Sequence, residues 1–496
     1  MEATWATILL LLLLLTLIWT WNMLKVLWFT PKRLERVLRE QGLRGNPYKL
    51  VVGDLKESQK MQKEALSKPM NLFDHDLGSR VESYTQHSLN KHGKNSFIWF
   101  GPVPRVTLTE PELIKEVLNK IYDFGKPNMN PLIMFLAPGL DMLPSFIKCC
   151  DDMIDKWEGM LSSNESNEID IDIWPFLKKL ASDVISRTAF GISYEEGKRI
   201  FKLLKEENEV AMKIIFKVFI PGWRFIPTSS HRRIKEIERD IKSSLMDMIN
   251  KREKALQTSE ATRNNLLDTL LQSNHKEIQE HGNNKNVGMN IKDVIEECKL
   301  FYLAGQETTS VLLVWTMILL GMYPDWQARA REEVLQVFGN RKPDFDGLNH
   351  LKIVTMILYE VLRLYAPITS LIRKVNKDMK IGNLSLPAGV QVFLSTILVH
   401  HDHELWGDDA KEFKPERFSE GILKATNGRI SFFPFGWGPR ICIGQNFSLL
   451  EAKIAISIIL QRFSFELSPT YAHAPTTMLT LKPKYGAQII LHKVKT

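Results

Sequence analysis

A single cysteine between glycines, just ahead of a long apolar segment, constrains this 496-residue chain more than any other feature. The stretch Phe435–Gly444 reads Phe-Gly-Trp-Gly-Pro-Arg-Ile-Cys-Ile-Gly, and the segment 447–463 after it predicts a helix. A cysteine before a helix start lies where backbone N–H groups and the helix dipole stabilise a thiolate. The glycines allow close approach to a flat group, and Arg440 can bind an anionic substituent of it. A haem with Cys442 as its iron ligand meets these requirements; the alternative is a buried structural thiol.

The complete pattern Phe-x-x-Gly-x-Arg-x-Cys-x-Gly resembles the haem-binding loop of the cytochrome P-450 monooxygenases at every fixed position. This resemblance implies a mainly α fold with small β-sheets, the cytochrome P-450 fold, preceded here by an N-terminal transmembrane helix. It also implies haem b as cofactor. The residues expected to bind the haem are Cys442, Arg440, Arg373, Phe435, Gly436 and Gly444.

The N-terminal segment 3–24 has no charged residue and contains seven consecutive leucines. Such a helix is about 30 Å long, which spans a bilayer core. Basic residues follow it, so the positive-inside rule places the rest of the chain in the cytosol. A cleaved signal peptide is the alternative, but the start is acidic at Glu2 and tryptophans lie where cleavage would fall. We therefore expect a transmembrane signal anchor (1–24), a basic membrane-proximal linker (25–54) and a haem-thiolate monooxygenase domain (55–496).

The linker contains Trp-x-x-Pro-Lys-Arg-Leu-Glu from Trp28 onward, which resembles the plant microsomal group that contains secologanin synthase. That resemblance places the protein in the endoplasmic reticulum membrane, single-pass, with its catalytic domain facing the cytosol. The basic segment 31–41 is amphipathic, so it lies along the membrane surface or forms a solvated helix. The net charge of +8 suits an anionic membrane or an acidic protein partner, and no motif points to nucleic acid.

One family feature is missing. Members usually carry a Trp-x-x-x-Arg helix that binds a haem propionate, but in 115–161 the only tryptophan is Trp157, followed four residues later by Leu161. The chain passes from Gly139-Leu140 directly to Asp141-Met142, so we expect a deletion near Leu140. The alternative to an active enzyme is therefore a catalytically impaired or non-catalytic membrane-anchored variant.

A helix is predicted over 290–320, with Asn290 as its cap. Its centre reads Ala-Gly-Gln-Glu-Thr-Thr (304–309), which is polar and flexible for a core helix. A threonine can hydrogen-bond to the preceding turn and bend the helix, which would leave a widened turn beside the haem. Thr308 and Glu307 would then be the catalytic residues that handle protons; otherwise this is a kinked core helix with a solvated Glu307. The sequence matches the family's oxygen-activation motif, which favours the catalytic role.

Glu360 and Arg363 share one face of a helix predicted over 351–365. In the family such a pair is buried and is joined by a later arginine, here Arg417, so these three residues are expected to support the haem loop. Three histidines resemble a metal cluster but are expected to lie in a loop: His400, His401 and His403.

Other expected elements are short strands at 97–101, 105–108, 375–376, 384–386 and 390–394, and helices at 110–118, 169–190, 195–219 and 230–256. The segment 257–288 is polar and is expected to form a mobile surface loop after the stretch 266–271.

The reaction implied by the resemblance is insertion of one oxygen atom of O2 into a C–H bond of a hydrophobic plant metabolite, a terpenoid. Candidate pocket residues are apolar: Phe301, Ala304, Ile368 and Leu371. The chain has no dinucleotide fingerprint, so electrons from NADPH must come through a partner, NADPH–cytochrome P-450 reductase. A basic membrane-surface adaptor without haem is a third hypothesis, which the intact cysteine loop disfavours.

Overall fold

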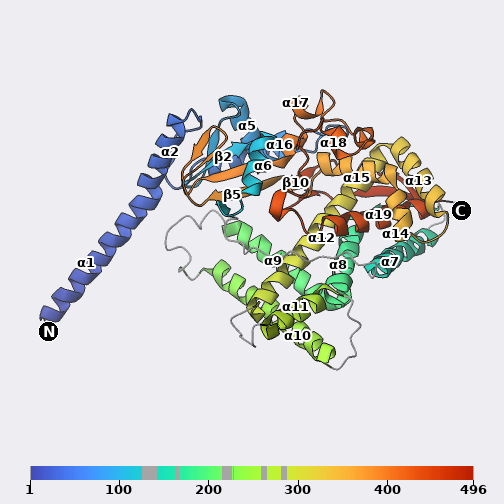
Figure 1. Ribbon diagram of the computed structural model, residues 1–496, viewed down its shortest axis with the longest axis horizontal. Coiled ribbons are helices and arrows are strands. Elements are labelled where there is room, and N and C mark those ends of the chain that lie inside the picture. The colour runs from blue at the N-terminus through green and yellow to red at the C-terminus, as the bar shows by residue number, and fades with distance from the viewer. Residues whose placement is uncertain are drawn as a thin grey trace.

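The computed structural model describes residues 2–125, 142–163, 167–214, 226, 228–257, 265–280 and 288–494. Helices predominate in these residues, and the strands form small sheets of two to five strands. Figure 1 shows the central helix α12 (Ile291–Met322) running through the molecule, with α9 (Tyr194–Ile214), α10 (Ser229–Gln257) and α11 (Leu266–Glu280) around one end of it. The expected fold, mainly α with small β-sheets, is confirmed.

The remaining α-helices are α1 (Glu2–Leu24), α2 (Thr30–Glu40), α3 (Leu55–Ala65), α4 (Leu77–Val81), α5 (Ser83–His92), α6 (Pro111–Asn119), α7 (Leu143–Ser162), α8 (Trp174–Phe190), α9 (Tyr194–Ile214), α10 (Ser229–Gln257), α11 (Leu266–Glu280), α13 (Pro324–Phe338), α14 (Phe345–His350), α15 (Lys352–Leu364), α16 (Thr396–His400), α17 (His403–Trp406), α18 (Ile422–Ala425) and α19 (Gln445–Arg462). A π-helix, η1 (Lys25–Phe29), joins α1 to α2, and two 3-10 turns are η5 (Pro415–Phe418) and η6 (Gly438–Arg440).

The largest sheet has the order β1-β2-β8-β5-β3. Its strands are β1 (Phe97–Phe100), β2 (Val103–Leu108), β8 (Gln391–Ser395), β5 (Ser370–Val375) and β3 (Phe124–Gly125). The smaller sheets are β4-β12-β9 (Glu168–Asp172, Gln488–Lys493, Phe463–Leu467), β6-β7 (Met379–Ile381, Leu384–Leu386) and β10-β11 (Pro475–Thr477, Leu481–Pro483).

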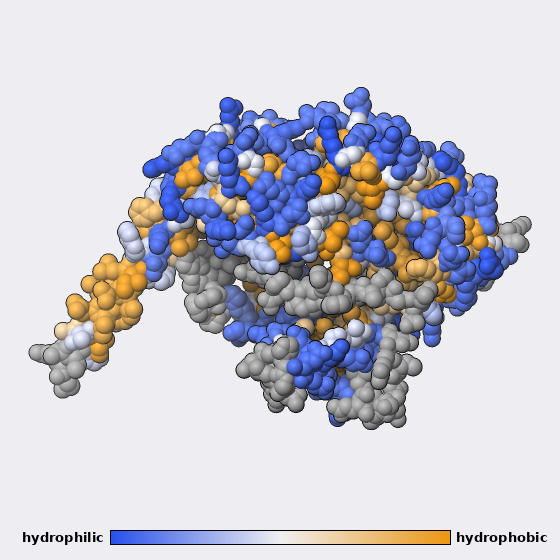
Figure 2. Space-filling view, in the orientation of Figure 1, coloured by the Kyte–Doolittle hydropathy of each residue, from blue (hydrophilic) through white to orange (hydrophobic). Residues whose placement is uncertain are grey.

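The N-terminal helix projects from the body of the molecule, and Figure 2 shows its surface as hydrophobic. The span Trp5–Glu40 is long and apolar enough to cross a membrane, and its most apolar window is 0% buried. Farther along, α2 is amphipathic, and its Leu34 and Leu38 pack into the core around the largest sheet. The apolar face of α2 is therefore covered by protein, whereas the two expectations for 31–41 were a helix on the membrane surface and a solvated helix.

The core forms around the second half of α12. Its residues from Val311 to Leu320 are all buried, in contact with α8, α15 and α19. By length and composition α12 also resembles a membrane span, but 72% of its apolar window is buried inside the protein. It is the core helix of this domain, because its apolar side chains are already covered by other helices.

Two expectations about the middle of the chain are wrong. Residues 169–172 form strand β4, because the alternation Ile-Asp-Ile-Asp matches the two-residue period of a strand, and α8 begins only at Trp174. The loop expected after 266–271 is also wrong in part, because residues 266–280 form α11. Its Leu267 and Leu271 are buried in a cluster with α8, α9 and α10, so tertiary packing stabilises a helix whose sequence is mostly polar.

The expectation of loop histidines is also wrong. His400 ends α16, His401 follows it, and both side chains are buried. His400 Nε2 accepts a hydrogen bond from Phe433 N at 2.9 Å, and His401 Nε2 donates to Leu364 O at 3.0 Å. Burial lowers the pKa of His400 to about 3, so it is neutral at pH 7. Among the described residues, no cluster of His, Cys, Asp or Glu could hold a metal ion.

Candidate active site

Two glycines give the cysteine loop backbone angles that other residues rarely adopt. Gly436 and Gly438 have φ of 75° and 73°, a region that favours glycine. A Cβ at Gly438 would also lie less than 2.5 Å from Asn119, the last residue of α6. Cys442 N donates a hydrogen bond to Phe435 O at 2.8 Å, which closes the loop before α19 begins at Gln445. Only glycine fits at Gly438, since both its backbone angles and its neighbour exclude a side chain.

The loop presents an apolar, exposed surface around its sulfur atom. Cys442 is exposed, and the flanking Ile441 and Ile443 are 46% and 37% exposed although both are apolar. A Cβ at Gly444 would lie 3.9 Å from Cys442 Sγ, so the thiol has little side-chain cover on that side. A soft sulfur ligand surrounded by apolar side chains fits a flat apolar group that carries a metal ion.

Two arginines lie beside this surface. Arg373 on β5 is buried, and burial together with the charge of Arg440 lowers the pKa of Arg373 to about 10. Its neighbour on β5, Leu371, lies 3.9 Å from the position of a Cβ on Gly436, so the strand contacts the loop. Two neighbouring cations need anionic partners when one of them is buried. The pair therefore fits the two carboxylates of a haem.

In α12 the expected cap is present as a capping box. Asn290 accepts hydrogen bonds from Lys292 N and Asp293 N, and Asp293 bonds back to Asn290 N. Thr308 Oγ1 donates to Ala304 O at 2.6 Å, the bond expected from the motif. However, α12 is a continuous α-helix through these residues, so the expected widened turn is not present.

Gly305 has a packing role that sequence reasoning missed. A Cβ at this position would lie 2.7 Å from side-chain atoms of Ile185 on α8. Glycine therefore lets α8 and α12 approach closely, which explains a glycine in a helix interior without a bend.

Glu307 is neither solvated nor unpaired. Lys178 Nζ on α8 lies 2.5 Å from Glu307 Oε1, and Thr480 Oγ1 donates to Glu307 Oε2 at 3.4 Å. The two charged side chains are 25% and 15% exposed. Sequence reasoning missed Lys178, and no local signal could have found it, since it lies 129 residues before Glu307.

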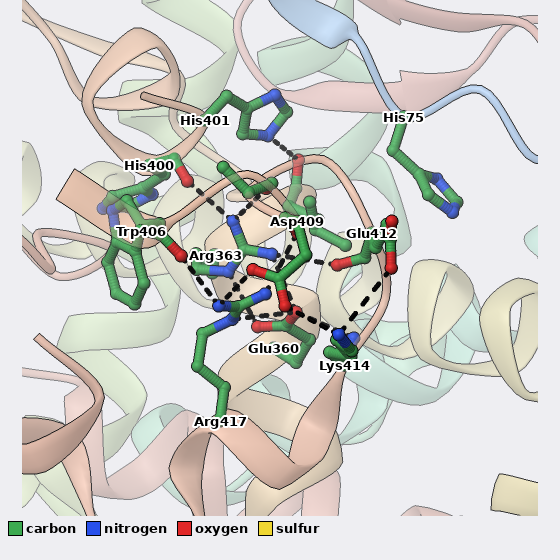
Figure 3. A network of polar contacts seen from close by, with 12 residues as sticks. His75, Glu360, Arg363, His400, His401, Trp406, Asp409, Glu412, Lys414 and Arg417 are labelled. Carbon is green, nitrogen blue, oxygen red and sulfur yellow. Dashed lines mark hydrogen bonds and ion pairs between the residues drawn. The ribbon is translucent and has the colours of Figure 1, made fainter. Parts of the chain in front are cut away.

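Glu360, Arg363 and Arg417 meet in a buried network, shown in Figure 3. Arg363 donates two hydrogen bonds of 2.7 Å to the Glu360 carboxylate, and both side chains are 0% exposed. Arg417 Nε lies 3.6 Å from Glu360 Oε1. This arrangement is a bidentate charge pair that is extended by a second arginine.

The network joins α15 to the segment that precedes the cysteine loop. Arg363 also donates to the carbonyls of His400, Ala410 and Glu412, and Arg417 donates to Trp406 O and to Asp409. The His400 imidazole in turn accepts from Phe433 N, and Phe433 O accepts from Gly436 N. A chain of hydrogen bonds therefore runs from Glu360 to the cysteine loop, and His400 is the link that sequence reasoning missed.

The cavities contain few of the residues expected in the pocket. A cavity of about 650 Å³ between α7, α8 and the start of α9 contains none of them. A chamber of about 290 Å³ beside the largest sheet contains Ile368. Phe301 and Leu371 are half-buried, and Ala304 is exposed on α12. The predicted deletion near Leu140 lies outside the described residues, since 126–141 are not among them.

Comparison with known proteins gives consistent results. A family model described as Cytochrome P450 matches residues 126–491. Cytochrome P450 716A67 of Medicago truncatula is 60% identical over 506 residues, covering 97% of this chain and 96% of the relative. An 11-oxo-beta-amyrin 30-oxidase of Glycyrrhiza uralensis is 55% identical, covering 96% of each chain.

Cytochrome P450 72A68 of Medicago truncatula is 55% identical over 524 residues, covering 100% of both chains. Because this alignment is longer than 496 residues, some positions of the relative have no counterpart here.

Proposed function

The chain belongs to the cytochrome P450 family, and we propose that it is a membrane-anchored monooxygenase that inserts one oxygen atom of O2 into a C–H bond of a terpenoid. Family membership makes it an oxidoreductase of the monooxygenase class. The observation that most directly supports this proposal is the exposed Cys442 in its apolar loop beside Arg373 and Arg440. The relatives named 11-oxo-beta-amyrin 30-oxidase favour a triterpenoid as the substrate.

The residues present fit a haem b. Cys442 would ligand the iron, Arg373 and Arg440 would bind the propionates, and Phe435, Gly436 and Gly444 would allow the ring to approach. When bound, the haem supplies the activation of O2 and the oxidation of the C–H bond, with thiolate ligation favouring O–O cleavage. The exposed apolar side chains of Ile441 and Ile443 would exclude water from that side.

Glu307 and Thr308 would move the protons. Glu307 pairs with Lys178, and its carboxyl would relay a proton at Oε1 once that contact opens. Thr308 Oγ1 donates to Ala304 O at 2.6 Å in this structure, and rotation about Cα–Cβ would release its hydroxyl from that bond so that it could donate a proton. Glu360, Arg363 and Arg417 would act only by holding the loop.

Electrons would come from NADPH through NADPH–cytochrome P-450 reductase, since the sequence contains no dinucleotide fingerprint. The basic surface suits an acidic docking face on that partner. The apolar α1 supports an anchor in the endoplasmic reticulum membrane, with the catalytic domain in the cytosol. The near-complete match to relatives named as oxidases favours an active enzyme over a non-catalytic variant.

The test is expression in microsomes, followed by the reduced carbon-monoxide difference spectrum and turnover of beta-amyrin-type triterpenoids with reductase and NADPH. A thiolate-type Soret band is expected in the wild type and in the control Cys298→Ala, but not in Cys442→Ala. A wild type that shows no such band would overturn the proposal.

A further inference from the structure

The chamber of about 290 Å³ lies on one face of the largest sheet. Arg105 on β2 pairs with Gln391 on β8, and Phe393 and Ser395 follow on the same face because strand side chains alternate. Arg373 is opposite Val392, so it points to the other face, toward the cysteine loop. The chamber is therefore separate from the candidate haem-propionate site.

Arg105 is a buried cation without an anionic partner among the residues that the structure describes. Its residue is 8% exposed, and its Nε and Nη2 donate to the neutral Gln391 Oε1 at 3.1 and 2.9 Å. The guanidinium lies 4.0 Å from the ring centroid of Phe100. Burial lowers the pKa of Arg105 to about 10, which still leaves it charged at pH 7. Since buried charges are costly unless they are paired, the chamber lacks an anion.

The carboxyl groups of the chamber do not supply that anion. Asp54 accepts hydrogen bonds from Trp99 N at 2.8 Å and from Asn46 Nδ2 at 3.2 Å. Glu82 is 8% exposed and accepts from Ser395 Oγ at 2.6 Å, while its Oε1 makes no hydrogen bond of ordinary geometry to a described residue. Burial raises the pKa of Glu82 to about 8, although hydrogen bonds with the Ser395 and Thr369 hydroxyls lower it in part. Glu82 is therefore mostly neutral at pH 7 and can donate a hydrogen bond.

The other side chains that line the chamber are suited to contact an apolar part of a ligand. Ile368 and Phe393 line the chamber, and Met478 and Leu479 stand over it from the turn between β10 and β11, each 51% exposed. Ile368 also begins the segment that leads through Leu371 to the cysteine loop. The turn that holds Met478 and Leu479 continues into Thr480, whose Oγ1 donates to Glu307 Oε2 at 3.4 Å, so one wall of the chamber reaches the helix that carries Thr308.

We propose that this chamber binds the carboxylate of an amphipathic polycyclic substrate, with Arg105 as its counter-ion and the apolar wall against its ring system. The polycyclic skeleton rests on the proposed function, whereas the carboxylate is inferred from Arg105 alone. A carboxylate supplies the missing negative charge, and its two oxygens match the planar set of N–H donors of a guanidinium. The neutral Glu82 does not repel it.

The test is isothermal titration of the full-length, haem-loaded protein in lipid nanodiscs with a beta-amyrin-type triterpenoid acid and with its methyl ester. We expect the wild type to bind the acid at least about tenfold more tightly, since charged hydrogen bonds contribute that much. Arg105→Gln should abolish this preference and leave the affinity for the ester unchanged, Arg105→Lys should retain part of it, and the exposed control Arg233→Gln should match the wild type. Equal wild-type affinities, or a preference that survives in Arg105→Gln, would overturn the inference.

A second variant covers the case in which Arg105→Gln does not fold. Ser58 on α3 is half-buried and lines the chamber, so Ser58→Asp adds a carboxylate without removing a core side chain. Binding of the acid should weaken at least about tenfold, with the ester unaffected, because the added carboxylate repels the ligand's own. If acid and ester bind equally, the inference fails but the terpenoid proposal stands; if neither binds, both fail.

Discussion

Lys178 Nζ lies 2.5 Å from Glu307 Oε1, so a lysine of α8 holds the carboxylate that precedes Thr308 on α12. The pair is largely buried and joins two helices that approach closely at Gly305. Glu307 is thereby oriented by a group that the motif around it does not contain. Lys178 is a positioning residue, and its removal should affect proton supply more than substrate binding.

Lys178→Met is expected to increase the fraction of NADPH oxidation that yields peroxide instead of product, with little change in the affinity for substrate. A misplaced proton relay typically costs about 10²-fold or more in rate. The measurement compares NADPH, peroxide and product, and records the pH profile of turnover. The control is Lys179→Met, since that lysine pairs with the exposed Glu195. Equal coupling in the two variants would contradict the role of Lys178.

Breaking the buried pair of Glu360 and Arg363 should lower the stability of the protein and of the segment that supports the cysteine loop. Glu360→Gln leaves Arg363 charged and 0% exposed, which we expect to cost about 3–5 kcal/mol. Denaturant unfolding and the ratio of bound haem to protein measure the effect. The matched exposed pair is Arg329 with Glu416, for which Glu416→Gln should cost less than about 1 kcal/mol. Similar losses in both variants would show that burial of the pair is unimportant.

Gly438→Ala should prevent the cysteine loop from closing, because its φ is 73° and the added Cβ would overlap Asn119. The expected result is loss of the thiolate-type carbon-monoxide band while the far-ultraviolet circular dichroism stays helical. Gly428→Ala is the control, since Gly428 has φ of 76° but open space around it, and it should cost only about 1 kcal/mol. A normal band in Gly438→Ala would contradict the close fit.

The contribution of two buried histidines to stability should fall as the pH is lowered from about 6.5 to 4. His75 and His473 both hydrogen-bond to the buried Tyr365 hydroxyl, and burial lowers their pKa values to about 4 and about 3. Between the unfolded and folded pKa values only the unfolded state binds the proton, so acid favours unfolding. Each histidine should cost up to about 2 kcal/mol at pH 5. Urea unfolding at pH 7 and pH 5 tests this by comparing the wild type with His75→Gln, which should lose less stability on acidification, and an equal loss in both would contradict it.

Glu82 should have the opposite pH dependence. Burial raises its pKa to about 8, so the folded state keeps a proton that the unfolded state loses above about pH 4.5. Its contribution is therefore complete at low pH and is lost as the pH rises toward 8. Glu82→Gln should lower the stability less at pH 8 than at pH 5, measured by urea unfolding. An identical effect at both pH values would show that Glu82 is ionised in the folded protein.

The sequence was sufficient where neighbouring residues carry the information. The capping box at Asn290, the glycine conformations at Gly436 and Gly438, and the pair formed by Glu360 and Arg363 three residues apart all follow from local geometry. The resemblance to the haem-binding loop also rests on a short pattern of neighbouring residues, Phe435 to Gly444. The apolar α1 is also a composition signal that needs no tertiary contact.

Tertiary structure decided what depends on segments far apart in the chain. Lys178 meets Glu307, His400 meets Phe433, and Arg105 is buried beside a neutral Gln391, although no local pattern links any of these pairs. Helix α11 was mispredicted for the same reason, because its stability comes from the surface that it covers, whereas the alternation that forms β4 is present in the sequence and was assigned the wrong period. Local propensity is worth tenths of a kcal/mol per residue, whereas burial of a side chain is worth several times more. Packing therefore determined which charges are paired and which buried arginine still lacks an anion.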